Sequence, residues 1–175
     1  MATWTIDTMH SEIGFKVKHL VISTVSGKFT KFEGSIETEG DDFNNAKVTF
    51  SADIDGIDTG VADRDGHLKS PDFFDAANHP KLTFESTSFT NKGGNDYELQ
   101  GNITIRGVAK PITLKVEHGG TGPNAYGQTV AGFELQGKIN RKDFGLNWSA
   151  VTEAGGIVVS DDVKLAMNIE VVKQA

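Results

Sequence analysis

The sequence contains no cysteine among its 175 residues. Disulfide bridges, thiol nucleophiles and cysteine-ligated zinc or iron–sulfur centres are therefore excluded. Proline is also scarce: there are four prolines, and none lies in the interior of the segments that alternate between apolar and polar side chains, although Pro111 begins one of them. Because proline cannot donate a hydrogen bond inside a sheet, this distribution agrees with β-structure in those segments.

Positive charge is in short supply. The chain has 17 Lys and Arg against 24 Asp and Glu, a formal net charge of −7, and no basic run. Phosphate backbones and anionic lipid surfaces attract clustered Lys and Arg, so this composition argues against both as partners. We therefore expect no nucleic-acid partner.

Long apolar runs are also missing. No stretch approaches the roughly 18 apolar residues that a membrane-spanning helix needs, so no stable membrane insertion is expected. The opening MATWTIDTMHSEIGF lacks the basic and apolar regions of a secretory signal. The sequence as written predicts a cytoplasmic protein. A periplasmic location would follow if it is a processed form whose leader has been removed.

Strict alternation of apolar and polar residues is the dominant pattern, and it is typical of half-buried strands in an antiparallel sheet. A short fragment at 3–6 adds to eight longer segments, at 11–20, 26–39, 47–57, 81–90, 98–106, 111–118, 130–140 and 162–172. No composition shift or repeat divides the chain. We predict an all-β fold in which residues 1–175 form a single domain, an antiparallel barrel of eight strands.

One stretch, VADRDGHLKSPDFFDAANHP at 61–80, does not alternate. Thr59 is suited to cap a first helical turn near Gly60. Ser70-Pro71-Asp72 combines a capping residue, a proline at the first helical position and an acid in the first turn. His79-Pro80 would end the helix, because the residue before a proline avoids the α region. We predict a short helical cap around residues 60–78.

The rows expected to face inward carry very small residues between large ones, at Gly34, Ala52, Gly101 and Gly137. An eight-stranded barrel is just wide enough to be filled by side chains or to hold one small ligand. Small side chains in several inward rows would leave part of the interior unfilled, which favours an apolar cavity. Small residues also occur where a barrel bends or tapers, so both interpretations stay open.

The polar residues show no established catalytic or metal-binding pattern. His67 and His79 are twelve residues apart, which is not the i, i+4 spacing of a helical metal pair. Asp7, His10 and Ser11 are close in sequence, but a catalytic triad is defined by geometry, and no G-x-S-x-G motif occurs. We assign no catalytic residue and no metal ligand.

The cap sequence allows two compatible interpretations. Leu68, Phe73 and Phe74 either plug one end of the barrel or line the mouth of a cavity. Arg64 and His67 are candidates to contact an anionic head group there. Otherwise Arg64 pairs with a nearby acid at the surface, an interaction of small energetic worth.

Four segments resemble the YceI-like family in their order and spacing, over essentially the whole chain. They read WTIDTMHSEIGFKVKHLVISTVSGKFTKFEG, RDGHLKSPDFFDAANHPKLTFES, ITIRGVAKPITLKV and INRKDFGLN. The resemblance implies a lipocalin-like barrel that binds long polyisoprenoids, such as prenyl phosphates or prenyl quinones. It implies a bound isoprenoid lipid with no other cofactor, no catalytic residue, and often a homodimer. Many members are exported with a leader.

The resemblance also carries particular residues. Those matching the family motifs are Arg64, His67, Leu68, Phe73, Phe74 and Asp75 in the cap, Val25, Gly27 and Phe29 in an early strand, and Asn140, Arg141, Asp143, Phe144 and Gly145 in the last motif. We interpret the last motif as structural.

Together these patterns predict a non-catalytic protein that binds, transports or stores a long-chain polyisoprenoid. Burial contributes about 0.8 kcal/mol per methylene-sized group, so a few isoprene units would suffice for micromolar binding. The expected lipid contacts are Phe15, Val17, Phe50, Ile54, Leu82, Phe84, Ile103, Ile105, Leu114, Phe133, Leu135 and Met167, with His19, Arg64, His67, Leu68, Phe73 and Phe74 in the cap or near a head group. Two alternatives are a hydrolase or isomerase using His19 or His67, and a filled barrel acting as an interaction or stress module.

Overall fold

A computed structural model describes residues 2–19, 23–40, 42–146 and 159–174, except the side chain of His19. The strands are β1 (Ala2–Ile6), β2 (Glu12–His19), β3 (Ser23–Phe29), β4 (Phe32–Glu39), β5 (Asp42–Asp53), β6 (Ile57–Asp58), β7 (Lys81–Gly93), β8 (Asp96–Ile105), β9 (Val108–Pro123), β10 (Thr129–Asn140) and β11 (Val159–Lys173). One α-helix, α1 (Ala62–Lys69), and three 3-10 turns, η1 (Thr8–His10), η2 (Ile54–Gly56) and η3 (Arg141–Phe144), complete the described elements.

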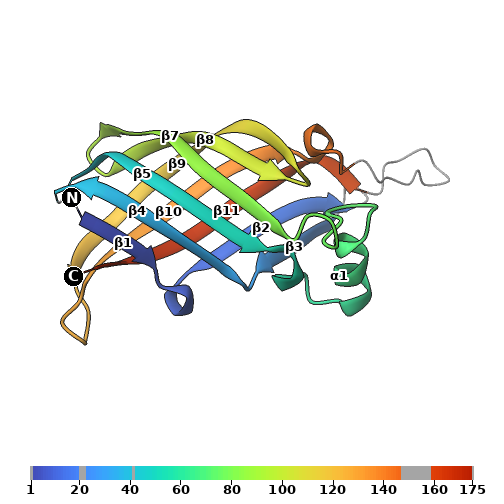
Figure 1. Cartoon of the computed structure of the whole chain (residues 1–175), viewed down its shortest axis with the longest axis horizontal. Helices are drawn as coiled ribbons and strands as arrows, with labels where there is room; N and C mark the ends of the chain where they lie inside the picture. Colours follow the sequence, from blue (N-terminus) through green and yellow to red (C-terminus); the bar gives the residue numbers. More distant parts are fainter. Residues whose placement is uncertain (1, 20–22, 41, 147–158, 175) are drawn as a thin grey trace.

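The strands close into an eight-stranded antiparallel barrel, as predicted (Figure 1). The ring runs β1-β4-β5-β7-β8-β9-β10-β11, and β1 pairs with β11 to close it. Neighbouring strands are mostly joined by short turns, so the hydrogen-bond ladder follows chain order from β7 to β11. The all-β, lipocalin-like fold class is therefore confirmed.

The first hairpin is bent, which the alternation did not reveal. β1 and β2 both pair with β11, at different heights, and are separated by η1. Their partner is likewise divided, because Thr30 and Lys31 separate β3 from β4. The single strand predicted at 26–39 was therefore wrong in its continuity. The facing also changes across the break: Val25, Gly27 and Phe29 of β3 face inward, whereas Gly34 and Ile36 do so in β4, because the three-residue step from Phe29 to Phe32 reverses the alternation.

The cap lies at one end of the barrel, and both chain termini lie at the other (Figure 1). Its helix is shorter than predicted. Val61 occupies the N-cap position, whereas the Thr59 hydroxyl donates a hydrogen bond to Asp65. Ser70 ends α1 instead of beginning a second helix, and residues 71–78 form turns. Asp75 has a left-handed φ of 52°, a conformation that interrupts an α-helix.

Candidate functional site

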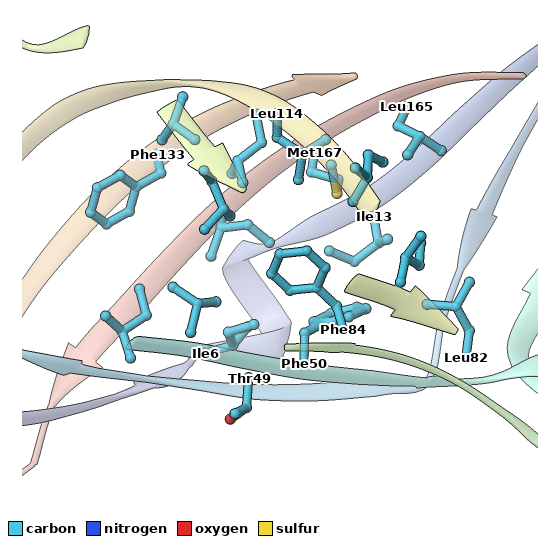
Figure 2. A pocket seen from close by; sticks show the side chains of 18 of the residues that line it. Ile6, Ile13, Thr49, Phe50, Leu82, Phe84, Leu114, Phe133, Leu165 and Met167 are labelled. Atoms are coloured by element: carbon cyan, nitrogen blue, oxygen red, sulfur yellow. The ribbon is translucent and has the colours of Figure 1, made fainter. Parts of the chain in front are cut away.

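The barrel interior holds two adjacent apolar chambers. The inner chamber has a volume of about 120 Å³, and Figure 2 shows Phe84, Leu114 and Met167 among the side chains around it. The outer chamber lies beneath the cap and measures about 130 Å³. The side chains that line both chambers, and so lie between them, are Phe15, Phe29, Leu82, Ile103 and Leu165, which we call the neck.

Most residues expected to face the cavity lie on its wall. The inner chamber is lined by Phe50, Phe84, Leu114, Phe133, Leu135 and Met167, the outer by Val17 and Ile105, and both by Phe15, Leu82 and Ile103. Ile54 is the exception and lines neither chamber. It begins η2, where β5 has ended, and its side chain is 2% exposed within the core. Contact of these residues with lipid stays a prediction.

Aromatic side chains close the barrel end that carries the termini. Phe43 lies at the centre, with ring centroids 5.1 Å from Trp4, 4.9 Å from Phe133 and 5.3 Å from His118. Trp4 Nε1 donates a hydrogen bond to Thr38, so its polar atom is satisfied inside the cluster. The cavity is therefore blocked at this end and faces the cap at the other.

The small residues of the inward rows do not themselves leave the empty space. A Cβ added to Gly137 would overlap the Leu114 side chain, and one added to Gly27 would overlap the ring of Phe15. Gly101 lies in the same way beneath the ring of Phe84. Each glycine therefore leaves room for a large side chain from a neighbouring strand, which fills the space that a Cβ would occupy. The barrel has a cavity, but of the two interpretations of the small residues, the one in which they leave its volume empty is wrong at Gly101 and Gly137.

The cap supplies apolar groups to the outer chamber. Leu68, Phe73 and Phe74 all line it, which combines the two interpretations of the cap. Arg64 and His67 do not line either chamber. Their role as head-group contacts stays a prediction, as does that of His19, whose side chain lies outside the described part of the structure.

Arg64 and His67 both make contacts within the cap itself. Arg64 Nε donates a hydrogen bond of 2.7 Å to Thr59 Oγ1, and its Nη2 donates to the Thr59 carbonyl at 2.6 Å. His67 Nε2 lies 2.9 Å from Asp72 Oδ2. Arg64 therefore holds the loop before α1, and the His67 contact joins the helix to the turns after it.

Arg141 is a buried cation at the rim of the outer chamber. It is 4% exposed, and it donates to the carbonyls of Leu146, Val159 and Ser160 at 2.6, 3.3 and 2.9 Å. Burial lowers the pKa of its guanidinium, and the nearby Asp161 carboxylate opposes that shift. These contacts join η3 to the start of β11. They agree with a structural role for the last family motif.

Several lining residues were missed from the sequence. The missed apolar ones are Ile6, Ile13, Val25, Phe29, Ile36, Val48, Phe89, Leu99, Ile112, Val116, Ile139, Phe144, Leu146, Val159, Val163, Leu165 and Ile169. Alternation identifies many of them, since Val163, Leu165 and Ile169 share a face with Met167. Arg141 carried no such signal, because a charged residue outside a strand gives no indication of which way it faces.

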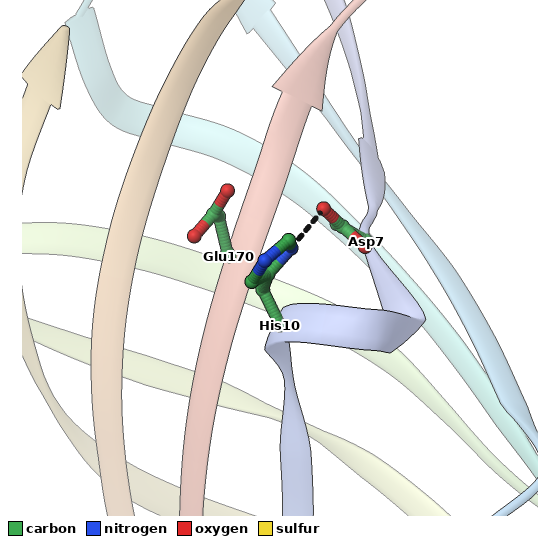
Figure 3. Close-up of side chains that lie close together, drawn as sticks. All are labelled: Asp7, His10 and Glu170. Carbon is green, nitrogen blue, oxygen red and sulfur yellow. Dashed lines mark hydrogen bonds and ion pairs between the residues drawn. The ribbon is translucent and has the colours of Figure 1, made fainter. Parts of the chain in front are cut away.

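One cluster outside the cavity combines the donor types that bind metals. Carboxylate oxygens of Asp7 and Glu170 and a ring nitrogen of His10 all lie within 4.8 Å of one another (Figure 3). Histidine and carboxylate are zinc ligands, although His10 Nδ1 already bonds Asp7. The Ser11 hydroxyl donates to the Glu170 carbonyl instead of contacting His10. The three neighbours Asp7, His10 and Ser11 therefore do not form a nucleophile–base pair.

The geometry of the barrel and its apolar interior agrees with the comparisons with known proteins. The YceI-like domain matches residues 4–171. The chain belongs to the YceI-like family. It is 36% identical to a UPF0312 protein of Staphylococcus aureus over 171 residues, 97% of each chain.

Solved structures agree with this family membership. The YceI protein of Campylobacter jejuni is 33% identical, with a TM-score of 0.78 over 97% of this chain and 96% of its own. A structure from Saccharophagus degradans, described as a polyisoprenoid binding domain, shares the fold at 16% identity. Its TM-score is 0.67, over 98% of both chains. In the part of this YceI-like chain that the structure describes, no helix has the length and apolar character to cross a bilayer.

Proposed function

We propose that this YceI-like protein binds a long-chain polyisoprenoid of the prenyl phosphate or prenyl quinone type, without catalysis, and carries or stores it. The observation that supports this most directly is the pair of adjacent apolar chambers that lie between the aromatic cluster and the cap and share the neck residues as a common wall. Two chambers in line suit a long, narrow chain better than a compact ligand. The description of the S. degradans relative as a polyisoprenoid binding domain points the same way.

The closed end gives the ligand an orientation. The aromatic cluster around Phe43 leaves the cap end for entry, so the tail would lie inward and the head group near the cap. Charged side chains in the described lining, Lys18 and Arg141, belong to the outer chamber. A polar head held there would avoid the cost of burying it without partners.

Binding fits the site better than catalysis. A general base must lie within hydrogen-bond reach of the atom it deprotonates. Among the described histidine side chains, none lines either chamber. The lumen is also not filled by aromatic rings along its length, which favours a ligand site over a solid interaction module.

The neck offers a direct test with a matched control. Leu165 lines both chambers, whereas its neighbour Ala166 is exposed on the outer face of β11. We expect Leu165→Trp to obstruct the neck and reduce prenyl quinone occupancy at least tenfold, and Ala166→Trp to leave it unchanged. Native mass spectrometry of freshly purified protein, alone and with added quinone, measures occupancy. Bare wild-type protein under both conditions would refute the proposal.

Homodimer formation is part of the same proposal, taken from the family resemblance. Sedimentation velocity at several protein concentrations measures it. A single species at the monomer mass would remove the dimer and leave the ligand proposal intact.

A further inference from the structure

Three lysines lie side by side across the outside of the barrel. Lys138 of β10 pairs with Lys164 of β11, and Lys164 pairs in turn with Lys16 of β2. All three are exposed. Like charges directly opposite one another destabilise a sheet, so this arrangement has a cost that the fold must offset.

The row is part of a larger basic surface. The exposed lysines that belong to it are Lys16, Lys18, Lys28, Lys138, Lys142 and Lys164, which we call the lysine surface. Asp162 lies 3.8 Å from Lys138, and Asp161 lies 3.3 Å from Lys142. Asp58 of β6 lies opposite Lys28 of β3 in the paired register. Six cations therefore face these three carboxylates, in a chain whose net charge is −7.

The lysine surface covers the outside of the outer chamber. Val17, Ile139 and Val163 each adjoin a lysine of the row in sequence, and each lines the outer chamber. Successive strand residues point to opposite faces, so the lysines lie on the outer face of the same wall. Lys18 itself contributes to the lining. The surface is therefore at the end of the barrel where a ligand would enter.

Charge changes sign along these same strands. Four residues further from the cap, Glu134 of β10 and Glu12 of β2 flank Asn168 of β11 in the paired register. That offset is about 13 Å along a strand, longer than the screening length of about 8 Å in physiological salt. This face of the barrel is thus basic toward the cap and acidic away from it. Such a gradient would orient the molecule against a negative surface.

From this arrangement we propose that the lysine surface docks the protein on an anionic lipid bilayer, with the outer wall of the outer chamber against the membrane. Docking itself is independent of the ligand. Its use in collecting or delivering an isoprenoid rests on the proposed function. Attachment is peripheral, through lysines at the headgroup level. It reverses the expectation drawn from net charge, because strand pairing gathers lysines that no sequence run contains.

Vesicle co-sedimentation tests the docking. We expect the wild-type protein to bind vesicles of phosphatidylglycerol and phosphatidylcholine at low salt, to be released at high salt, and to ignore pure phosphatidylcholine. A lysine near such a surface contributes about fivefold in affinity. The triple variant Lys16→Gln, Lys138→Gln, Lys164→Gln should therefore bind about 100-fold more weakly.

The matched control removes the same charge elsewhere. Lys47, Lys92 and Lys115 are exposed on β5, β7 and β9, and changing all three to Gln should leave vesicle binding near that of the wild type. Equal losses in the two triple variants, or no wild-type binding at low salt, would overturn the proposal. Tighter binding to duplex DNA than to the anionic vesicles would assign the surface to nucleic acid and overturn it as well.

Two readouts separate docking from ligand binding. The lysine triple variant should keep its prenyl quinone occupancy by native mass spectrometry, and Leu165→Trp should keep its vesicle binding. Thermal unfolding checks the fold, and we expect the lysine variant to melt at or slightly above the wild-type temperature because cross-strand repulsion is removed.

Discussion

His10 Nδ1 lies 2.7 Å from Asp7 Oδ2 where β1 turns into β2 on the outside of the barrel (Figure 3). Asp7 caps the start of η1 and His10 is its last residue, and this turn bends the first strand. The Asp7 backbone N–H also donates to the Glu170 carbonyl at 2.8 Å. The ion pair therefore forms where the bent strand is fastened to β11.

The first prediction concerns the pH dependence of this pair. The hydrogen bond to Asp7 raises the pKa of His10 above its ordinary value of 6.5, and the bond to His10 lowers the pKa of Asp7 below 3.8. The His10 contribution to stability is thus present below pH 6.5 and is lost as pH rises through the raised pKa. The Asp7 contribution is lost as pH falls through its lowered pKa.

NMR titration of the imidazole measures the pair. Asp7→Asn should return the His10 pKa toward 6.5, whereas Asp72→Asn, at the other carboxylate–histidine contact, should not move it. An unchanged His10 titration in Asp7→Asn would contradict the assignment.

The second prediction concerns the closed end of the barrel. Phe43 is 2% exposed and contacts three other rings, so Phe43→Ala should lower the free energy of unfolding by about 3–5 kcal/mol. Tyr126 is 89% exposed, and Tyr126→Ala should change it by less than about 0.5 kcal/mol. Urea denaturation measures both. Similar values for the two would show that the cluster is not tightly packed.

The third prediction concerns Gly137 of β10, which lies directly beneath the Leu114 side chain. Gly137→Ala would drive a methyl group into Leu114 and should cost about 1–3 kcal/mol by overpacking. Gly132 lies in the same strand with open space around its Cβ position, so Gly132→Ala is the matched control and should cost far less. Adding Leu114→Ala to Gly137→Ala should recover part of the loss in a double-mutant cycle. Additive effects would argue against the contact.

The fourth prediction concerns Arg141. Arg141→Met removes the donors to three carbonyls at the chamber rim and should cost about 3 kcal/mol, because buried acceptors lose their partners. Arg141→Lys should recover little of this, since an ammonium group lacks the planar fork. Lys142→Met, at an exposed neighbour, should be nearly neutral. Urea denaturation compares the three variants. A mild effect in Arg141→Met would mean that water replaces its contacts.

Much of the barrel could be predicted from local patterns. A side-chain period of two assigns the faces of β8 to β11 and the apolar character of the lumen, because one buried face is all that alternation requires. In β7 it holds for Leu82 and Phe84, but the register shifts between Ser86 and Ser88, and Phe89 faces inward out of phase with them. The cap was placed correctly at residues 60–78, since capping residues, proline and lost alternation coincide there. The second helix predicted to begin at Ser70-Pro71 does not form. Asp75 takes a left-handed backbone conformation there, and no residue pattern in the sequence indicates it.

Alternation in the sequence by itself determined the all-β class and most of the inward rows, and four sequence motifs carried the resemblance to the family. Tertiary structure alone decided which side chains became neighbours. Strand register, set by pairing between distant segments, placed Lys16 beside Lys164, Leu114 over Gly137 and Phe43 against Trp4. Side-chain alternation with a period of two indicates only whether a residue faces into or out of the barrel. The residue beside it across the ladder depends on the closed barrel as a whole.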